Sequence, residues 1–433
     1  MSMLGKVPGM VRWAMAAAGA MVVATVVSNA ANYAYSLVMS RMLGPERFGE
    51  FTALLGVLMI LSIATQLVQT VVARYVTELR SGRDPGSVPA FVNRLARVMA
   101  VVGLAAFVVS VPLAWPVAAA LQIDHIAPVV ATMSALVLGF VVPVAWGRFQ
   151  GEQAFWRLGT SMVVLNLARV AVGVALVAVG FGVSGAIAAT TIATVFVAAM
   201  VLPALRAPSS PSAGAGPELA TLARFALPTL GALVAWAMLT NFDVVIVKAM
   251  AVPADAGYYG AAATVGKIAL FLPTALGLVI LPKGAARHHA GVDSRGILRR
   301  TGQALVVVSG ALTAICALWG DRVVHLMFTS EYAPAADLLV PIVVAMSCFA
   351  LANVMLFYYL GVGRTTFSVV LIVAMVFQIA LLLLVASSPK EAALVQMAVG
   401  IGIVAANEAL YVPLLRPLPK ARRAGGSGDP PPA

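Results

Sequence analysis

The sequence predicts an all-α polytopic membrane protein with twelve transmembrane helices in two six-helix lobes. Of its 433 residues, 61% are hydrophobic and only 10% are charged, and the mean hydropathy is +0.99. Soluble proteins carry about 25% charged residues. The number of apolar side chains is larger than the core of a soluble protein can bury. Most of them must therefore contact lipid. The spacing of apolar windows between short polar loops then gives the number of helices.

Twelve windows are long and apolar enough to span a bilayer, which takes about 20 residues. In the first half of the chain they cover residues 14–40, 48–73, 95–117, 127–147, 155–180 and 184–205. In the second half they cover residues 223–248, 257–281, 299–320, 335–360, 365–387 and 391–414. The first window follows basic residues as a signal peptide does, but it runs on to Met39, so we expect a retained helix.

Polar segments divide the chain into four parts. Residues 1–205 form the N-terminal lobe, 206–222 a cytoplasmic linker, 223–415 the C-terminal lobe and 416–433 a disordered cytoplasmic tail. Most of the 28 Lys and Arg side chains fall on the side of the membrane that holds the N-terminus. The positive-inside rule therefore predicts a multi-pass protein of the cytoplasmic (plasma) membrane with both termini in the cytoplasm. It also explains the net charge of +12 without a nucleic-acid partner.

The two halves share a pattern after their first helices. Arg41 is followed by a Pro-containing turn and Gly49, and Lys248 is followed by a similar turn and Gly257, at an offset of 208 residues between the glycines. An internal duplication explains this match, although glycine at membrane interfaces is common and coincidence is the alternative. Because each half has an even number of spans, the duplication predicts a pseudo-twofold axis along the membrane normal and a cavity between the lobes.

No motif of a catalytic, cofactor or metal site holds up. The stretch from Gly260 to Ile268 is similar to a phosphate-binding loop, but it has five residues between its glycines and Ile268 where Ser or Thr must hold magnesium. The two cysteines and four histidines form no ligand set. We therefore expect no cofactor, no metal and no enzymatic activity.

Polar residues recur in the first span at spacings of three and four, which places them on one helix face. A polar face in a span either lines an aqueous cavity or forms hydrogen bonds to neighbouring helices. Gln66 continues the pattern in the second span. The candidates for a cavity lining on the first span are Asn29, Asn32, Tyr33 and Ser36, with Arg41 at the end of the helix.

Five further residues place polar or charged groups deep in the membrane. Arg169 in the fifth span either binds a ligand or extends toward the basic loop. Asn241 and Asp243 lie in the seventh span and Lys267 in the eighth. Asp243 and Lys267 either form a structural ion pair or act in transport. Asp243 and Glu408, the other deep carboxylate, are the candidates for coupling transport to an ion.

The segment from Asn29 to Leu54, NAANYAYSLVMSRMLGPERFGEFTAL, resembles the polysaccharide flippase branch of the multidrug/oligosaccharidyl-lipid/polysaccharide exporter superfamily. Shorter stretches that start at Gln150, Asn241 and Leu326 are similar to it as well. The resemblance implies a two-lobed transporter that moves a polyprenyl-diphosphate-linked saccharide from the cytoplasmic to the outer leaflet by alternating access. It implies membrane lipids as partners, together with the saccharide polymerase or glycosyltransferases of the same pathway. The scarcity of acidic residues in the spans departs from better-known members.

Charges in the spans agree with an anionic, lipid-linked saccharide as substrate. Guanidinium and ammonium groups bind diphosphate oxygens well, so we expect Arg41 and Lys267 to attract the diphosphate while the polar face of the first span hydrates the sugar. A cation-coupled exporter of drugs or other small molecules with the same fold is the alternative. A membrane-bound saccharide polymerase or ligase would need an acid–base site, for which the outer loops are too short.

Overall fold

The computed structural model of the chain describes the backbone of residues 7–82, 85–206, 219–289, 295–361 and 366–411. Within these ranges every regular element is a helix. Side chains are described for residues 21–82, 86–206, 230–271, 298–359 and 366–411. Most of the predicted linker at 206–222 and the whole predicted tail at 416–433 lie outside the described residues.

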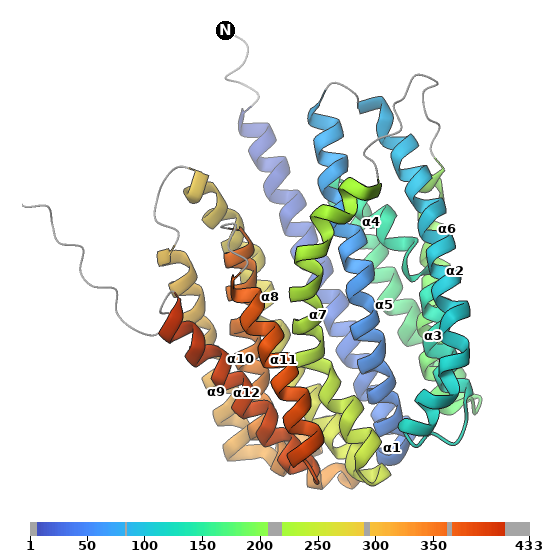
Figure 1. Cartoon of the computed structure of the whole chain (residues 1–433), viewed down its shortest axis with the longest axis vertical. Helices are drawn as coiled ribbons and strands as arrows, with labels where there is room; N and C mark the ends of the chain where they lie inside the picture. Colours follow the sequence, from blue (N-terminus) through green and yellow to red (C-terminus); the bar gives the residue numbers. More distant parts are fainter. Residues whose placement is uncertain (1–6, 83–84, 207–218, 290–294, 362–365, 412–433) are drawn as a thin grey trace, which may run out of the picture.

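The helices form an N-terminal and a C-terminal group. The N-terminal group consists of α1 (Val7–Ser81), α2 (Val88–Ala120), α3 (Ala127–Gly139), α4 (Val142–Gly151), α5 (Phe155–Ala178) and α6 (Gly182–Leu205). The C-terminal group consists of α7 (Leu219–Met250), α8 (Pro253–His289), α9 (Arg295–Met327), α10 (Ala336–Gly361), α11 (Thr366–Val385) and α12 (Pro389–Leu410). Short 3₁₀ turns, η1 (Pro85–Ser87) and η2 (Ser330–Ala335), precede α2 and α10. Figure 1 shows α2–α6 on one side of the molecule and α8–α10 and α12 on the other, with α1 and α7 between them.

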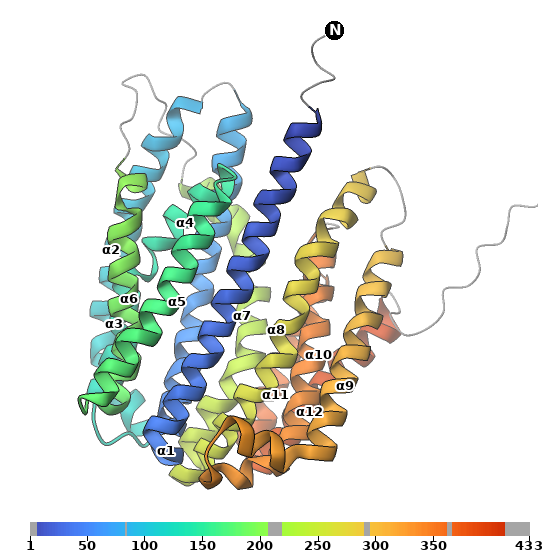
Figure 2. The ribbon, with the colours of Figure 1, turned by 180° about the vertical axis from the view of Figure 1, so that it is seen from behind.

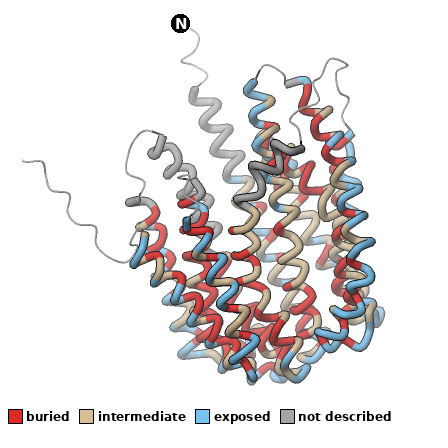
Figure 3. The backbone as a smooth tube through the Cα atoms, in the orientation of Figure 1, coloured by how far each residue is buried: buried red, intermediate tan, exposed pale blue. Residues whose placement is uncertain are grey.

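The outer faces of the bundle are apolar. Among the described residues, nine helices are long and apolar enough to cross a membrane, or ten if the bent pair α3 and α4 counts as one. Large hydrophobic side chains such as Trp115 and Leu384 are exposed on these helices. Figure 3 shows the exposed positions along the outward side of α2 and the buried ones inside the bundle. The protein is therefore a multi-pass membrane protein.

α1 contains the first two predicted spans in one element. The helix reverses direction at Gly44, whose backbone angles (φ 73°, ψ 170°) are accessible to glycine and unfavourable for other residues. Pro45, which has no N–H group to donate, then starts the second arm. Figure 2 shows the first arm descending from the N-terminus to this turn. We call this end of the bundle the Gly44 end and the opposite end the N-terminal end.

The span predicted at 127–147 is bent in the structure. α3 and α4 meet at a bend of 41° around residues 140–141. Pro143 lies at the start of α4 and cannot donate the backbone hydrogen bond that would continue α3. The N–H group of Val141 instead donates to the carbonyl of Leu138 (3.0 Å), which tightens the last turn of α3.

Buried apolar residues form two clusters in different places. The larger cluster includes residues of both helix groups, among them Phe48 of α1, Tyr259 of α8 and Tyr332 of η2. The smaller cluster is confined to α1, α2, α4, α5 and α6 and includes Phe91 and Phe149. The two helix groups thus share a core toward the Gly44 end, whereas the N-terminal group packs on its own toward the N-terminal end.

Candidate functional site

A cavity of about 390 Å³ lies between the two helix groups. Both arms of α1 line one wall and α8 lines the other, with Val244 as the one contribution of α7. We call it the central cavity. Its polar lining consists of Asn29, Asn32, Tyr33, Ser36, Thr52, Thr264 and Lys267. Among the described residues, no group of three His, Cys, Asp or Glu side chains could hold a metal ion.

The polar face of the first arm of α1 points into the central cavity. Asn29, Asn32, Tyr33 and Ser36 all line it, because spacings of three and four residues keep them on one side of the helix. Three of them also bond to protein groups. Ser36 donates its hydroxyl to the backbone carbonyl of Asn32 (3.5 Å). Tyr33 donates its hydroxyl to Sδ of Met327 (3.7 Å), and Asn32 accepts a hydrogen bond from Arg169. The remaining donors and acceptors of this face are positioned for a ligand.

Lys267 supplies a positive charge to the cavity wall. Its Nζ donates to Oδ1 of Asn241 (3.1 Å), and Asn241 in turn donates to the carbonyl of Ala237 (3.1 Å). Lys267 is half-buried, whereas Asn241 is buried beside the cavity. Within the described part of the chain Lys267 forms no ion pair, so an anionic ligand can neutralise it.

Asp243 does not pair with Lys267. Its carboxylate is fully buried and accepts a hydrogen bond from the hydroxyl of Tyr259 (2.8 Å), with Gln396 of α12 also fully buried beside it. Two residues turn an α-helix by about 200°, so Asp243 points away from the side on which Asn241 meets Lys267. Within the described residues Asp243 and Lys267 therefore form no ion pair and bond to different partners, while their opposite charges still attract each other.

Arg169 is held inside the N-terminal group and does not extend toward the loop. Only 9% of the residue is exposed. It donates to Oδ1 of Asn32 and its guanidinium lies 4.7 Å from the centre of the Tyr35 ring. The Tyr35 hydroxyl is in turn bonded to the carbonyl of Ala186. Arg169 is thus absent from the cavity lining but contacts it through Asn32.

Three other predicted residues lie away from the central cavity in this conformation. Arg41 is exposed at the Gly44 end and donates to the carbonyls of Leu326 (3.3 Å) and Met327 (3.2 Å) at the end of α9. Gln66 is exposed on the second arm of α1. Glu408 is half-buried near the end of α12. None of the three is among the lining residues.

Sequence reasoning missed part of the lining. Thr264 lies four residues after Gly260 and three before Lys267, and all three line the cavity from α8. This spacing is a local signal that places the three residues on one helix face, independently of the similarity to a phosphate-binding loop. Thr52 on the second arm of α1 carries no such signal, because its place follows only from the turn at Gly44.

The Gly44 end of the cavity is closed by contacts between the groups. Phe48 packs edge-on against Tyr332 with ring centres 5.8 Å apart, and Tyr332 donates its hydroxyl to the carbonyl of Ser40 (2.9 Å). Gly49 packs closely against Gly257. A Cβ on Gly257 would overlap the carbonyl of Pro45, which lies in the same turn of α1. Backbone contact at this point requires glycine on α8.

Comparison with known proteins gives a family and a fold. Residues 38–337 match the family described as polysaccharide biosynthesis protein. The lipid II flippase MurJ in an inward closed conformation has a TM-score of 0.72 at 12% identity, over 90% of this chain and 87% of that one. An inward-facing multidrug resistance MATE family transporter of the MOP superfamily has a TM-score of 0.72 at 14% identity, over 89% and 96%. A search of curated proteins finds no match.

A third solved structure, a MOP superfamily transporter from Pyrococcus furiosus, has a TM-score of 0.63 at 15% identity, over 89% of this chain and 93% of that one. Identities this low show a shared fold and leave the substrate open. The matched structures are flippases and transporters rather than enzymes. The chain therefore shares the fold of these MOP superfamily structures, and it belongs to the polysaccharide biosynthesis protein family, in agreement with its resemblance to the polysaccharide flippase branch.

Proposed function

We propose that the protein flips a polyprenyl-diphosphate-linked saccharide from the cytoplasmic to the outer leaflet by alternating access. The central cavity is the observation that carries this proposal. Amide and hydroxyl groups of α1 face it from one side and the ammonium group of Lys267 from the other. Such a lining suits an uncharged sugar attached to an anionic diphosphate. Its volume of about 390 Å³ is that of a small-ligand pocket and accommodates a saccharide headgroup.

The proposal assigns roles to the polar and charged residues that the sequence analysis singled out. Asn29, Tyr33 and Ser36 bind sugar hydroxyls, and Lys267 binds the diphosphate. Asn32 binds the sugar through its amide N–H group, because Arg169 already occupies its carbonyl oxygen. Asn241, Arg41 and Gln66 do not line the cavity; Asn241 acts through Lys267, and Arg41 and Gln66 act in other steps of transport.

Arg41 acts in the conformation in which the Gly44 end is open. In the closed conformation its guanidinium is bonded to the carbonyls of α9. Opening separates Arg41 from these carbonyls and frees a cation at the exit of the cavity. The diphosphate then has a second positive group to pass to on its way out.

Orientation follows from the distribution of charge. We infer that both termini are cytoplasmic, that the Gly44 end faces outward and that the protein lies in the plasma membrane. Residues 1–205 and 223–415 then form two lobes about a pseudo-twofold axis. The contact between Gly49 and Gly257 supports this axis, because equivalent residues meet near a twofold axis. Membrane lipids and the polymerase or glycosyltransferases of the same pathway are the expected partners.

The test is mass spectrometry of polyprenyl-linked lipids from cells that lack the protein. Wild type should clear an accumulated lipid-linked saccharide, whereas Lys267→Ala should not. Lys390→Ala removes an exposed lysine at the start of α12 and is the matched control, which should behave as wild type. An unchanged lipid profile in the deletion strain contradicts flipping. Normal transport by both Lys267→Ala and Arg41→Ala, at normal expression, contradicts the assignment of the site.

A cation-coupled exporter of small molecules is the second candidate. One observation favours it: Asp243 is fully buried among Tyr259 and Gln396, and a buried carboxylate needs a proton or a cation to offset its charge. An exporter of this kind requires that Asp243→Asn abolish resistance to a transported drug. Drug resistance is measured in Glu408→Gln as well, to compare the two deep carboxylates. If deletion of the protein leaves drug resistance unchanged and alters polyprenyl-linked lipids, the exporter is excluded.

A further inference from the structure

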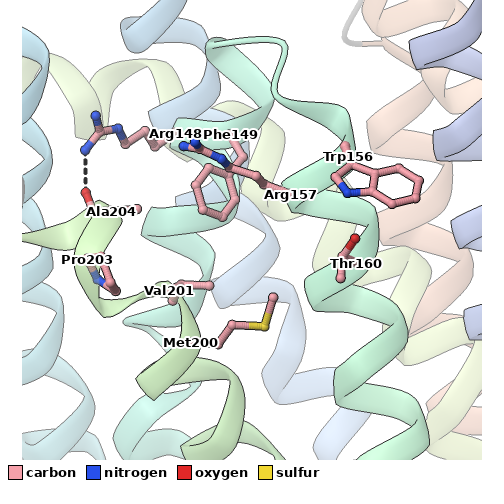
Figure 4. A pocket seen from close by; sticks show the side chains of 9 residues that line it. All are labelled: Arg148, Phe149, Trp156, Arg157, Thr160, Met200, Val201, Pro203 and Ala204. Carbon is pink, nitrogen blue, oxygen red and sulfur yellow. Dashed lines mark hydrogen bonds between the residues drawn. The ribbon is translucent and has the colours of Figure 1, made fainter.

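A second cavity, of about 510 Å³, lies on the outside of the N-terminal group near the N-terminal end. The end of α4, the start of α5 and the end of α6 enclose it, as Figure 4 shows. It shares no lining residue with the central cavity. Its rim is open to the surroundings, since Trp156 is 76% exposed there. We call it the peripheral cavity.

The two arginines of the peripheral cavity differ in their partners. Arg148 is neutralised by Glu152 (Nε to Oε1, 2.7 Å) and also donates to the carbonyl of Ala204. Arg157 is exposed, and it forms neither a hydrogen bond nor an ion pair with any described residue. Figure 4 shows its side chain extending from α5 over the cavity. The cavity therefore carries one uncompensated positive charge.

Polar and apolar parts of the lining are separated. Arg157 and the hydroxyl of Thr160 lie one turn apart on α5. Met200 and Val201 form an apolar wall below them in the view of Figure 4, and the Phe149 ring lies beside Arg157. A tryptophan at the rim is typical of the boundary between headgroups and acyl chains. The cavity thus has a cationic polar side and an apolar side, as an amphipathic anion requires.

We propose that the peripheral cavity binds an anionic phospholipid. Its phosphate contacts Arg157 and Thr160, and one acyl chain lies along Met200 and Val201. The charge of Arg157 selects an anionic headgroup over a zwitterionic one. The apolar wall gives an acyl chain a contact that a water-soluble phosphate compound cannot use. This site is independent of the proposed transport substrate and of the central cavity.

Native mass spectrometry of the full-length protein in detergent tests the site. Phosphatidylglycerol is titrated against the wild type, Arg157→Gln and Arg97→Gln. Arg97 is an exposed arginine of α2 outside the cavity, so its substitution removes the same charge elsewhere. We expect Arg157→Gln to weaken binding of the first phosphatidylglycerol about fivefold, the effect of one basic residue at a membrane surface. Arg97→Gln should bind as wild type.

Two further arms separate the lipid from other sources of phosphate. Phosphatidylcholine should bind the wild type more weakly than phosphatidylglycerol does. The two lipids should bind Arg157→Gln with equal affinity. Millimolar sn-glycerol 3-phosphate should not displace phosphatidylglycerol. Thr160→Trp keeps Arg157 but fills the cavity, so it should also reduce binding.

Several results would overturn the proposal. One is wild-type affinity in Arg157→Gln or Thr160→Trp. Another is an equal loss in Arg97→Gln, which indicates attraction by surface charge alone. Displacement by glycerol 3-phosphate would assign the cavity to a soluble phosphate compound. Arg157 is exposed, so Arg157→Gln should fold, and an unchanged elution volume of the purified protein checks this.

Discussion

Arg41 and Lys248 end the first helix of each half of the chain, and they make similar contacts in different surroundings. Arg41 of α1 donates to the carbonyls of Leu326 and Met327 at the end of α9. Lys248 of α7 donates to the carbonyl of Gln122, just after α2 (3.4 Å). Each cation thus crosses to the carbonyl end of the third span in the other helix group, where the helix dipole favours positive charge.

Burial distinguishes the two contacts. Arg41 is exposed, whereas Lys248 is only 1% exposed. The contact of Lys248 is also reciprocated, because Nε2 of Gln122 donates to the carbonyl of Ala249 (3.1 Å). The exposed contact of Arg41 can break and let water replace it, whereas breaking the contact of Lys248 leaves its buried ammonium group unpaired. The comparison indicates that α2 and α7 form the fixed side of the Gly44 end, and α1 and α9 the side that opens.

The largest effect should come from Lys248→Ala. It leaves the carbonyl of Gln122 without its donor and creates a cavity, so we expect a loss of about 3 kcal/mol in the free energy of unfolding. Thermal unfolding of the purified protein in detergent measures this. Lys390→Ala, at an exposed position, is the control and should unfold as wild type does. Equal stability of the two variants would remove the distinction between a fixed and an opening side.

Gly257→Val should have the next largest effect. The added side chain meets the backbone of Pro45 and must push α8 from α1, at a cost of about 2 kcal/mol. Gly402→Val on α12 is a suitable comparison, because a Cβ there meets no atom within 4 Å. A thermal unfolding profile of Gly257→Val that coincides with that of Gly402→Val would show that the two groups do not need this close contact.

Arg41→Gln should have the smallest effect on stability, about 0.5 kcal/mol, because water replaces the lost contact. It should instead favour opening of the Gly44 end by about twofold. Ser40→Cys, at a fully buried position beside Tyr332, reports this opening through its rate of thiol labelling in a protein with Cys316 and Cys348 replaced by Ala. An unchanged labelling rate in Arg41→Gln would place the opening side elsewhere.

The sequence predicted the helices and one wall of the central cavity, because both depend on local patterns. Apolar windows locate spans, and spacings of three and four residues locate the face of Asn29, Asn32 and Tyr33. The opposite orientation of Asn241 and Asp243 also follows from helix geometry, and it argues against the ion-pair alternative for Asp243 and Lys267. Pro143 was a local signal too, and it explains why the span at 127–147 is bent.

The partners of each polar group could not be predicted, since they depend on how helices distant in sequence are placed. Nothing near Arg41 in the chain indicates that it contacts the end of α9, and nothing near Asn32 indicates Arg169. The matching glycines at 49 and 257 were visible as a repeat. Their direct contact follows only from the arrangement of the two groups.

The smaller apolar cluster has a consequence for biogenesis. It is built wholly from the N-terminal group, so this part of the bundle can pack before the ribosome has synthesised the second half. The larger cluster lacks its partners until α8 and α10 enter the membrane. During synthesis, therefore, the apolar surface around Phe48 remains in contact with lipid or an insertion chaperone, and assembly ends when the C-terminal group covers it.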